Sequence, residues 1–207
     1  MEIIDIYRKL KVIYNSRAEE QWSLWCKRPK TLEEKETVMI ESILTQRANW
    51  KNVVLAVENL ERAGILSMEK ILACALENLE LLIKPSGFYR LKAQRLKVLA
   101  DFILNGCGGI KQAENIATNT LRSRLLALKG VGEETSDDIL LYAFERPIFV
   151  IDEYTRRLAK ELKLTDDFSY LHLQHVFEQG LGRKNYALYQ DFHALIVIDG
   201  KVKNRGG

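Results

Sequence analysis

Apolar residues recur at helical spacing along almost the whole chain, and this periodicity constrains the fold more than any other feature. Near the N-terminus, for example, Ile3, Tyr7, Leu10 and Ile13 form one stripe. Only three of the 207 residues are proline, which interrupts helices because it lacks a backbone N–H donor. Residues 147–151 form a short extended apolar linker that could be a strand but has no evident partner strand. The sequence therefore predicts an all-α fold.

Several helix ends follow from local sequence signals. Thr31 to Glu34 has the pattern of a capping box, and Ser67 is expected to cap a short helix. Gly64 is expected to end the helix that precedes Ser67. A longer helix is predicted after Pro85-Ser-Gly87 and before a loop at residues 105–109. Its inward-facing residues are expected to be Leu91, Ala93, Leu96, Leu99 and Phe102.

Charge and cysteine content exclude some classes of protein. The 31 basic and 28 acidic residues give a net charge of +3, which permits nucleic-acid binding without indicating it. Cys26, Cys74 and Cys107 are far apart and form no CxxC pair, which argues against a zinc or iron–sulfur site. We interpret them as reduced thiols of a cytosolic protein. Charged residues interrupt the first 15 residues, so we expect neither a signal peptide nor a membrane span.

The most informative segment is the Gly-Val-Gly turn at residues 130–132, between two predicted helices. Glycines at positions 130 and 132 permit positive φ and the close approach of another backbone. Such a turn presents backbone N–H groups at a helix N-terminus, where they bind an anion such as a DNA phosphate without reading its sequence. A G-x-G pattern is also typical of an ordinary tight turn between helices, so the flanking residues must decide between the two interpretations.

The flanking residues resemble a known signature. The segment 128–157 is similar to the helix-hairpin-helix and Gly/Pro/Asp motif of the endonuclease III superfamily of DNA glycosylases. The matching positions are Leu128, Gly130, Val131, Gly132, Thr135, Pro147, Asp152, Tyr154 and Arg157. Weaker similarities lie at residues 43–50 and 83–93, and the resemblance spans residues 35 to 200 in all.

The resemblance implies a two-lobed helix-hairpin-helix glycosylase fold with a DNA-binding cleft between the lobes. One lobe would be the contiguous helices of residues 35–145, with the hairpin motif at 121–145; the other would combine residues 1–34 and 146–207. The expected DNA-binding hairpin residues are Leu128, Lys129, Gly130, Val131, Gly132 and Thr135. The carbonyl groups of Leu128 and Gly130 are a candidate site for a monovalent cation.

The resemblance also assigns roles to two side chains outside the hairpin. Asp152 would be the catalytic carboxylate, since positive charge develops on the sugar as a glycosidic bond breaks. An aspartate at this position is equally expected to cap the helix that begins at Glu153, and the two roles are compatible. Gln46 would enter the DNA stack and fill the gap left by a flipped-out base; the alternative is an exposed glutamine at a helix end.

Two departures from the family pattern narrow the chemistry. Members that cleave the DNA backbone carry a lysine nucleophile two residues past the second hairpin glycine, where this chain has Glu134. A carboxylate cannot form an imine, so the expected enzyme is monofunctional and uses water. Iron–sulfur members carry four cysteines after the last helix, where this chain has a basic tail at residues 200–207. We therefore expect no cluster and no other cofactor.

Among members without the lysine and the cluster, the chain resembles the 3-methyladenine DNA glycosylases most. Residues 45–46, 85–89, 173–177, 187–189 and 192–193 carry this similarity. An alkylated purine is cationic and has a weakened glycosidic bond, so a stacking pocket and one carboxylate are sufficient. Candidate pocket residues are Trp22, Trp25, Glu134 and His193, although both tryptophans also fit an ordinary core and Glu134 fits a favourable charge at a helix N-terminus.

The expected partner is double-stranded DNA with one damaged base, bound by a monomer in the prokaryotic cytoplasm and at the nucleoid. Three alternatives stay open on sequence alone. The first is a monofunctional glycosylase for mismatched thymine, uracil or oxidised guanine. The second is a non-catalytic helix-hairpin-helix DNA-binding protein, which would have no need of Asp152. The third is a bifunctional lyase that uses another lysine.

Overall fold

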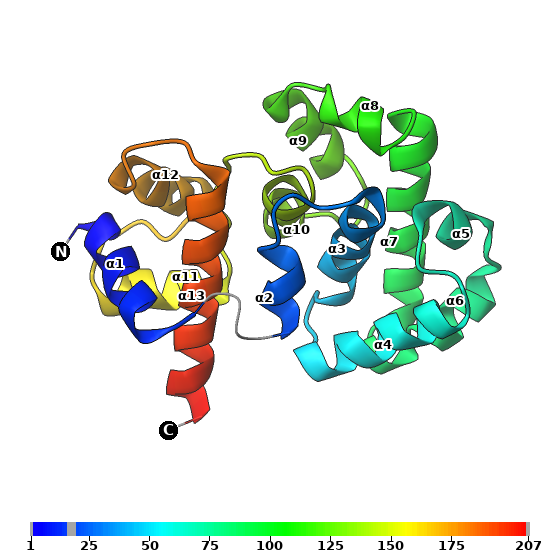
Figure 1. Ribbon diagram of the computed structural model, residues 1–207, viewed down its shortest axis with the longest axis horizontal. Coiled ribbons are helices and arrows are strands. Elements are labelled where there is room, and N and C mark those ends of the chain that lie inside the picture. Colours follow the sequence, from blue (N-terminus) through cyan, green and yellow to red (C-terminus); the bar gives the residue numbers. More distant parts are fainter. Residues whose placement is uncertain (1, 16–19, 206–207) are drawn as a thin grey trace. The chain divides into compact units, whose positions relative to one another are not determined.

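The computed structural model describes residues 2–15 and 20–205, and within these ranges the chain is helical without a β-strand (Figure 1). The all-α prediction is confirmed. The chain divides into two compact units: unit 1 combines residues 1–28 and 140–207, and unit 2 is residues 29–139. Unit 2 begins at residue 29 and ends at residue 139, and each limit lies six residues before that of the lobe predicted at residues 35–145. None of the described helices is long and apolar enough to cross a membrane.

Unit 2 is built around α3 and α7. It contains α3 (Leu32–Leu44), α4 (Trp50–Arg62), α5 (Met68–Ala73), α6 (Leu76–Leu82), the 3-10 turn η1 (Lys84–Ser86), α7 (Tyr89–Asp101), the π turn η2 (Phe102–Gly106), α8 (Ile110–Glu114), α9 (Thr118–Leu126) and α10 (Glu133–Asp138). The predicted caps are present: Thr31 forms a capping box with Glu34, and Ser67 accepts a hydrogen bond from Lys70 N–H. Helix α10 packs against α9 and α3. The turn between α9 and α10 is thereby fixed beside the helix that leads to Gln46.

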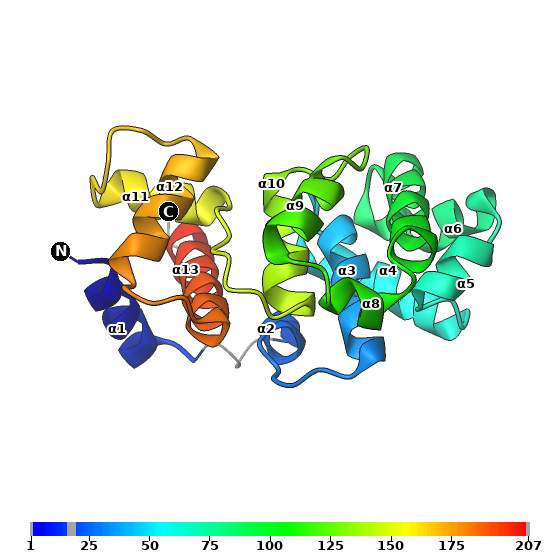
Figure 2. The same ribbon diagram turned by 90° about the horizontal axis from the view of Figure 1, so that it is seen from above.

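Unit 1 is arranged around the long C-terminal helix α13 (Tyr186–Arg205), shown in red in Figures 1 and 2. Its other elements are α1 (Ile3–Ile13), α2 (Glu20–Trp25), the π turn η3 (Ile139–Ala143), α11 (Glu153–Glu161) and α12 (Tyr170–Gly180). Helices α1 and α11 pack against α13, and α12 packs against α1. Residues 200–205, the described part of the basic segment predicted after the last helix, continue α13. Lys203 in this last part forms ion pairs with Asp199 and Glu161.

The extended linker at residues 147–151 is anchored by side chains and not by a partner strand. The Phe149 ring stacks on Phe177, with centroids 4.9 Å apart. Two side chains of α12 form hydrogen bonds with the linker backbone at Phe149. Glu178 accepts from the Phe149 N–H group at 2.9 Å, and Gln174 donates to the Phe149 carbonyl oxygen at 2.7 Å. The linker thus has a fixed course, and it places Asp152 at the start of α11.

Ala93, Leu96, Leu99 and Phe102 are buried as predicted for helix α7, and Leu91 is the exception. Leu91, expected to face inward, is 51% exposed, whereas the neighbouring Lys92 is fully buried. Apolar periodicity cannot identify a buried lysine, because its burial depends on partners for the ammonium group. The π turn η2 also extends the helical path through Gly106, into the segment predicted as a loop. Helices α2 and α8 were not predicted.

Candidate active site and DNA-binding hairpin

The turn between α9 and α10 is a tight hairpin. Val131 N–H donates to the Leu128 carbonyl oxygen at 3.1 Å, and the Val131 side chain is buried. Gly130 has a φ of +90°, which favours glycine. A Cβ atom at Gly130 would also lie 2.3 Å from Arg95 Nε, so the guanidinium packs directly on the glycine backbone. The hairpin depends on this glycine for both reasons.

The second hairpin glycine has a different role. Gly132 is the N-cap of α10 in extended backbone with a φ of −94°, so the positive φ permitted at both glycines occurs only at Gly130. A Cβ atom at Gly132 would meet nothing within 4 Å. Gly132 and Lys129 are exposed, as is Glu134 in the first turn of α10. The first N–H groups of a helix lack partners within it, so this exposed end suits an anion.

Gln46, just beyond the end of α3, is bound to the hairpin. Its Nε2 donates to the Gly130 carbonyl oxygen at 3.1 Å and to Thr135 Oγ1 at 2.9 Å. Its Oε1 accepts a hydrogen bond from Arg95. Both N–H groups and the oxygen of this amide are therefore engaged within unit 2. Insertion of Gln46 into DNA stays a prediction, and it requires the amide to leave these partners.

Lys92, on α7, links the end of α3, just before Gln46, to the turn η1. Its Nζ donates to the carbonyl oxygens of Leu44, at the end of α3, and Ser86, in η1, both at 2.7 Å. Burial, with a smaller contribution from the nearby Arg95 charge, lowers the pKa of Lys92 to about 8. No sequence signal distinguishes Arg95 and Lys92 from ordinary residues of a helix surface.

Asp152 is the N-cap of α11, as its position predicts. Its Oδ1 accepts a hydrogen bond from Thr155 N–H at 2.7 Å, and its Oδ2 lies 3.7 Å from Nε2 of His193 on α13. The side chain is 15% exposed. Burial by itself raises the pKa of Asp152, but His193 and the Thr155 N–H group together outweigh it, so the pKa lies below its ordinary value. The carboxylate therefore stays ionised at neutral pH in a largely desolvated position.

His193 belongs to a buried aromatic cluster that also contains Trp22, Trp25 and Tyr142. His193 Nδ1 lies 2.7 Å from the Tyr142 hydroxyl. Trp22 packs edge-on against both Trp25 and His193, with centroids 5.8 and 5.9 Å apart. Both indoles are at most 2% exposed. Three of the four candidate pocket residues thus lie together in unit 1, whereas Glu134 belongs to unit 2.

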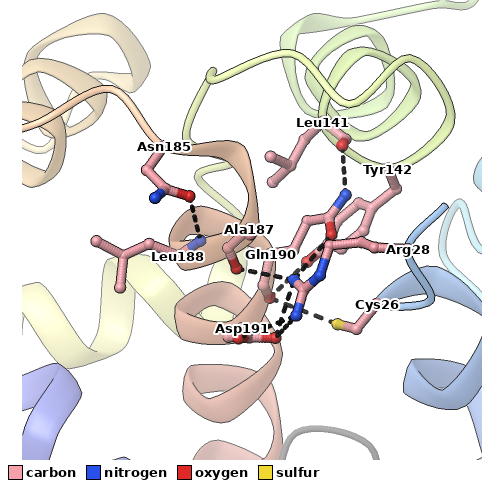
Figure 3. A network of polar contacts seen from close by, with 9 residues as sticks. All are labelled: Cys26, Arg28, Leu141, Tyr142, Asn185, Ala187, Leu188, Gln190 and Asp191. Atoms are coloured by element: carbon pink, nitrogen blue, oxygen red, sulfur yellow. Dashed lines mark hydrogen bonds and ion pairs between the residues drawn. The ribbon is translucent and has the colours of Figure 1, made fainter.

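A polar network fixes residues 26–28 and 140–142 onto the helix that carries His193 (Figure 3). The Arg28 guanidinium donates to both carboxylate oxygens of Asp191, at 3.2 and 3.3 Å. Gln190 is fully buried, accepts from Arg28 at Oε1 and donates from Nε2 to the Leu141 carbonyl at 2.7 Å. No local sequence signal identifies these pairs, since the partners are some 50 to 160 residues apart.

An exposed helix N-terminus after a tight hairpin suits an anion such as a phosphate, and a buried ionised carboxylate suits a reaction that develops positive charge. Comparison with known proteins identifies the family. The HhH-GPD superfamily of base excision DNA repair proteins matches residues 40–182. The chain belongs to this superfamily and is a DNA glycosylase.

Individual relatives agree with this assignment. The chain is 37% identical to a candidate DNA repair glycosylase of Methanocaldococcus jannaschii over 93% of its length and 85% of that protein. It is 28% identical to endonuclease III of Thermotoga maritima over 60% of its length and 55% of that enzyme. The structure superposes on the 3-methyladenine DNA glycosylase of H. pylori, bound to an ethenoadenine, with a TM-score of 0.83 and 28% identity; the match covers 98% and 99% of the chains. A trapped endonuclease III–DNA complex shares the fold, with a TM-score of 0.68, 19% identity, and 94% and 81% coverage.

Proposed function

We propose that this protein is a monofunctional DNA glycosylase that hydrolyses the N-glycosidic bond of an alkylated purine of the 3-methyladenine type, flipped out of duplex DNA. The observation that carries this proposal is the state of Asp152. Its carboxylate is largely buried, one oxygen is fixed by Thr155 N–H, and its pKa is lowered. A charged group held in this way suits a reaction that develops positive charge.

The chemistry follows from this carboxylate. Positive charge grows on the sugar as the glycosidic bond breaks, and a fixed anion in a desolvated site stabilises it more strongly than water does. The same carboxylate can orient or deprotonate the attacking water. A cationic alkylated purine is already a good leaving group, so one carboxylate is sufficient.

The side chains near the hairpin favour hydrolysis over a lyase reaction. Glu134 stands where a lysine nucleophile is expected and cannot form an imine. Lys92 has the lowered pKa of a reactive amine, but it is fully buried and its Nζ donates to two carbonyl oxygens. Neither residue supports covalent attack on the sugar.

The choice of substrate rests on similarity and on the aromatic cluster. The 3-methyladenine glycosylase of H. pylori matches almost the whole chain at 28% identity. Trp22, Trp25 and His193 pack together in one buried aromatic cluster, and His193 lies next to Asp152. Aromatic rings of this kind suit an electron-poor alkylated base, provided that the cluster opens to admit it.

The remaining expectations form part of the same proposal: a monomer in the prokaryotic cytoplasm that binds damaged duplex DNA and needs no iron–sulfur cluster or other cofactor. A monovalent cation at the hairpin is compatible with the geometry. The Leu128 carbonyl already accepts from Val131 N–H and the Gly130 carbonyl from Gln46, but each carbonyl oxygen has a second lone pair.

The test is a panel of duplexes that each contain one damaged base, incubated with the protein and then treated with mild alkali. We expect strand cleavage for the alkylated purine and only after alkali treatment. Borohydride added to the reaction should trap no covalent complex. Excision of mismatched thymine, uracil or oxidised guanine in its place would reject the substrate, and a trapped complex would reject hydrolysis by water.

A further inference from the structure

His193 lies between Tyr142 and Asp152 and directs one ring nitrogen at each. Its Nδ1 is 2.7 Å from the Tyr142 hydroxyl, and its Nε2 is 3.7 Å from Asp152 Oδ2. The side chain is 4% exposed, and Nε2 has no hydrogen-bond partner among the described residues. An unsatisfied buried nitrogen is costly unless it has an electrostatic role, and the group that it faces is the proposed catalytic carboxylate.

The Tyr142 hydroxyl decides which ring nitrogen of His193 carries a hydrogen. The hydroxyl lies 2.7 Å from His193 Nδ1 and 3.3 Å from the Gln190 carbonyl oxygen, and the shorter contact favours donation to Nδ1. An imidazole that accepts at Nδ1 carries its hydrogen on Nε2, which is directed at the Asp152 carboxylate.

Among the described groups in contact with this ring, Asp152 is the charged one. The groups that face the imidazole are the Trp22 ring from α2, the Phe149 ring from the linker, the Tyr142 hydroxyl from η3 and Asp152 at the start of α11. Of these, only Tyr142 and Asp152 titrate. His193 itself is fixed on α13, to which the buried Gln190 ties η3.

We propose that His193, held by Tyr142, is a positioning residue of the glycosylase: it presents an N–H group to Oδ2 of Asp152 and keeps this carboxylate charged and in one orientation. This inference rests on the proposed function, in which Asp152 acts on the sugar. Thr155 N–H holds Oδ1 and His193 faces Oδ2, so the two contacts together define the plane of the carboxylate. In this positioning role His193 acts through Asp152, in addition to its place in the aromatic cluster.

The test compares three variants that keep an aromatic ring. His193→Phe removes both ring nitrogens, and Tyr142→Phe removes only the hydroxyl that orients them. Tyr189→Phe is the matched control, because Tyr189 is also fully buried, lies on α13 and has a hydroxyl without a hydrogen-bond partner among the described residues. Circular dichroism establishes which variants fold, and Tyr142→Phe decides the question if His193→Phe does not fold.

Two measurements are made on each variant. Single-turnover excision should fall about 10- to 100-fold in His193→Phe, by analogy with the orienting partners of metal ligands, with unchanged DNA binding. Tyr142→Phe should lose less, and Tyr189→Phe should match the wild type. The second measurement is the titration of the Asp152 carboxyl by NMR of protein labelled at aspartate, with Asp152→Asn to assign the signal. The midpoint of the Asp152 titration should move to higher pH in His193→Phe and Tyr142→Phe, and it should stay unchanged in Tyr189→Phe.

The two readouts separate this inference from the proposed function. If the wild type does not excise an alkylated purine, the proposed function fails, whereas the carboxyl titration still tests the contact between His193 and Asp152. An unmoved titration in folded His193→Phe and Tyr142→Phe would overturn the inference, even in a protein that excises the expected base. A moved titration with full excision activity would also overturn it, since the contact would then not serve the reaction.

Discussion

Gln46 Nε2 donates a hydrogen bond to the Gly130 carbonyl oxygen at 3.1 Å, and this contact joins two elements that are 84 residues apart in the sequence. One is the segment expected to enter the gap in the DNA, and the other is the turn expected to hold its backbone. Arg95 completes the assembly, because its guanidinium donates to Gln46 Oε1 and packs on Gly130. Changes in either element should therefore affect the other.

Gln46→Ala should have two effects. It removes the amide partner of Gly130 and Thr135, and we expect a loss of about 1 kcal/mol in the free energy of unfolding, measured by denaturant titration. Excision should fall more on duplex DNA than on single strands, because only the duplex has a gap to fill. Gln94→Ala, an exposed glutamine on α7, is the control. Equal losses on both substrates would show that Gln46 only braces the hairpin.

The two hairpin glycines should respond differently to a side chain. Gly130→Ala introduces a strained positive φ and a clash with Arg95, and should destabilise the fold by about 1–3 kcal/mol. Gly132 has an ordinary extended backbone and open space where a Cβ atom would lie. The thermal stability of Gly132→Val should therefore stay near that of the wild type. This substitution should nevertheless weaken binding to all duplexes alike, since the contact is with the backbone. A change confined to the preference between lesions would contradict the phosphate-binding role.

The sequence predicted the parts of this fold that depend on near neighbours. Caps at Thr31, Ser67 and Asp152 satisfy N–H groups three residues away, so their spacing is visible in the chain. The contacts of Arg95 with Gln46 and of Tyr142 with His193 cross 49 and 51 residues. Periodicity indicates that a position is buried but not which polar group faces it, and for this reason Tyr142 could not be assigned to the candidate site.

A buried ion pair joins α9 to the end of α10, and breaking it should be costly. Arg122 donates to both oxygens of Asp137 at 2.6 and 2.9 Å, and the Asp137 side chain is fully buried. Arg122→Met leaves that carboxylate without its bidentate partner, and we expect a loss of about 3 kcal/mol in unfolding free energy. The exposed pair of Arg62 and Glu58 is the comparison, and Arg62→Met should cost less than about 1 kcal/mol. Similar losses in both variants would contradict this account.

Lys92 should make stability depend on pH in the alkaline range. Its pKa is lowered from 10.5 to about 8 in the folded chain, so between these values the unfolded state binds more protons. The contribution of Lys92 to the free energy of unfolding should therefore rise as pH increases from about 8 to 10.5. Lys92→Met removes the titrating amine, and the slope should flatten relative to the wild type in denaturant titrations. Lys84→Met, an exposed lysine of η1, should leave the slope unchanged.

Asp152 should be the carboxylate on which excision depends. Asp152→Asn keeps an oxygen that can accept from Thr155 N–H, so the cap of α11 and the fold should persist. It removes the charge that stabilises the developing sugar cation, a contribution of about 2.7–4 kcal/mol, and excision should slow by at least about a hundredfold with lesion binding retained. Because the wild-type pKa of Asp152 is lowered, activity should persist as pH falls below the ordinary carboxyl range, until this group protonates. Glu134→Ala should be much milder. Single-turnover excision across pH measures all three, and near-normal excision by a folded Asp152→Asn variant would exclude Asp152 as the group that stabilises the sugar.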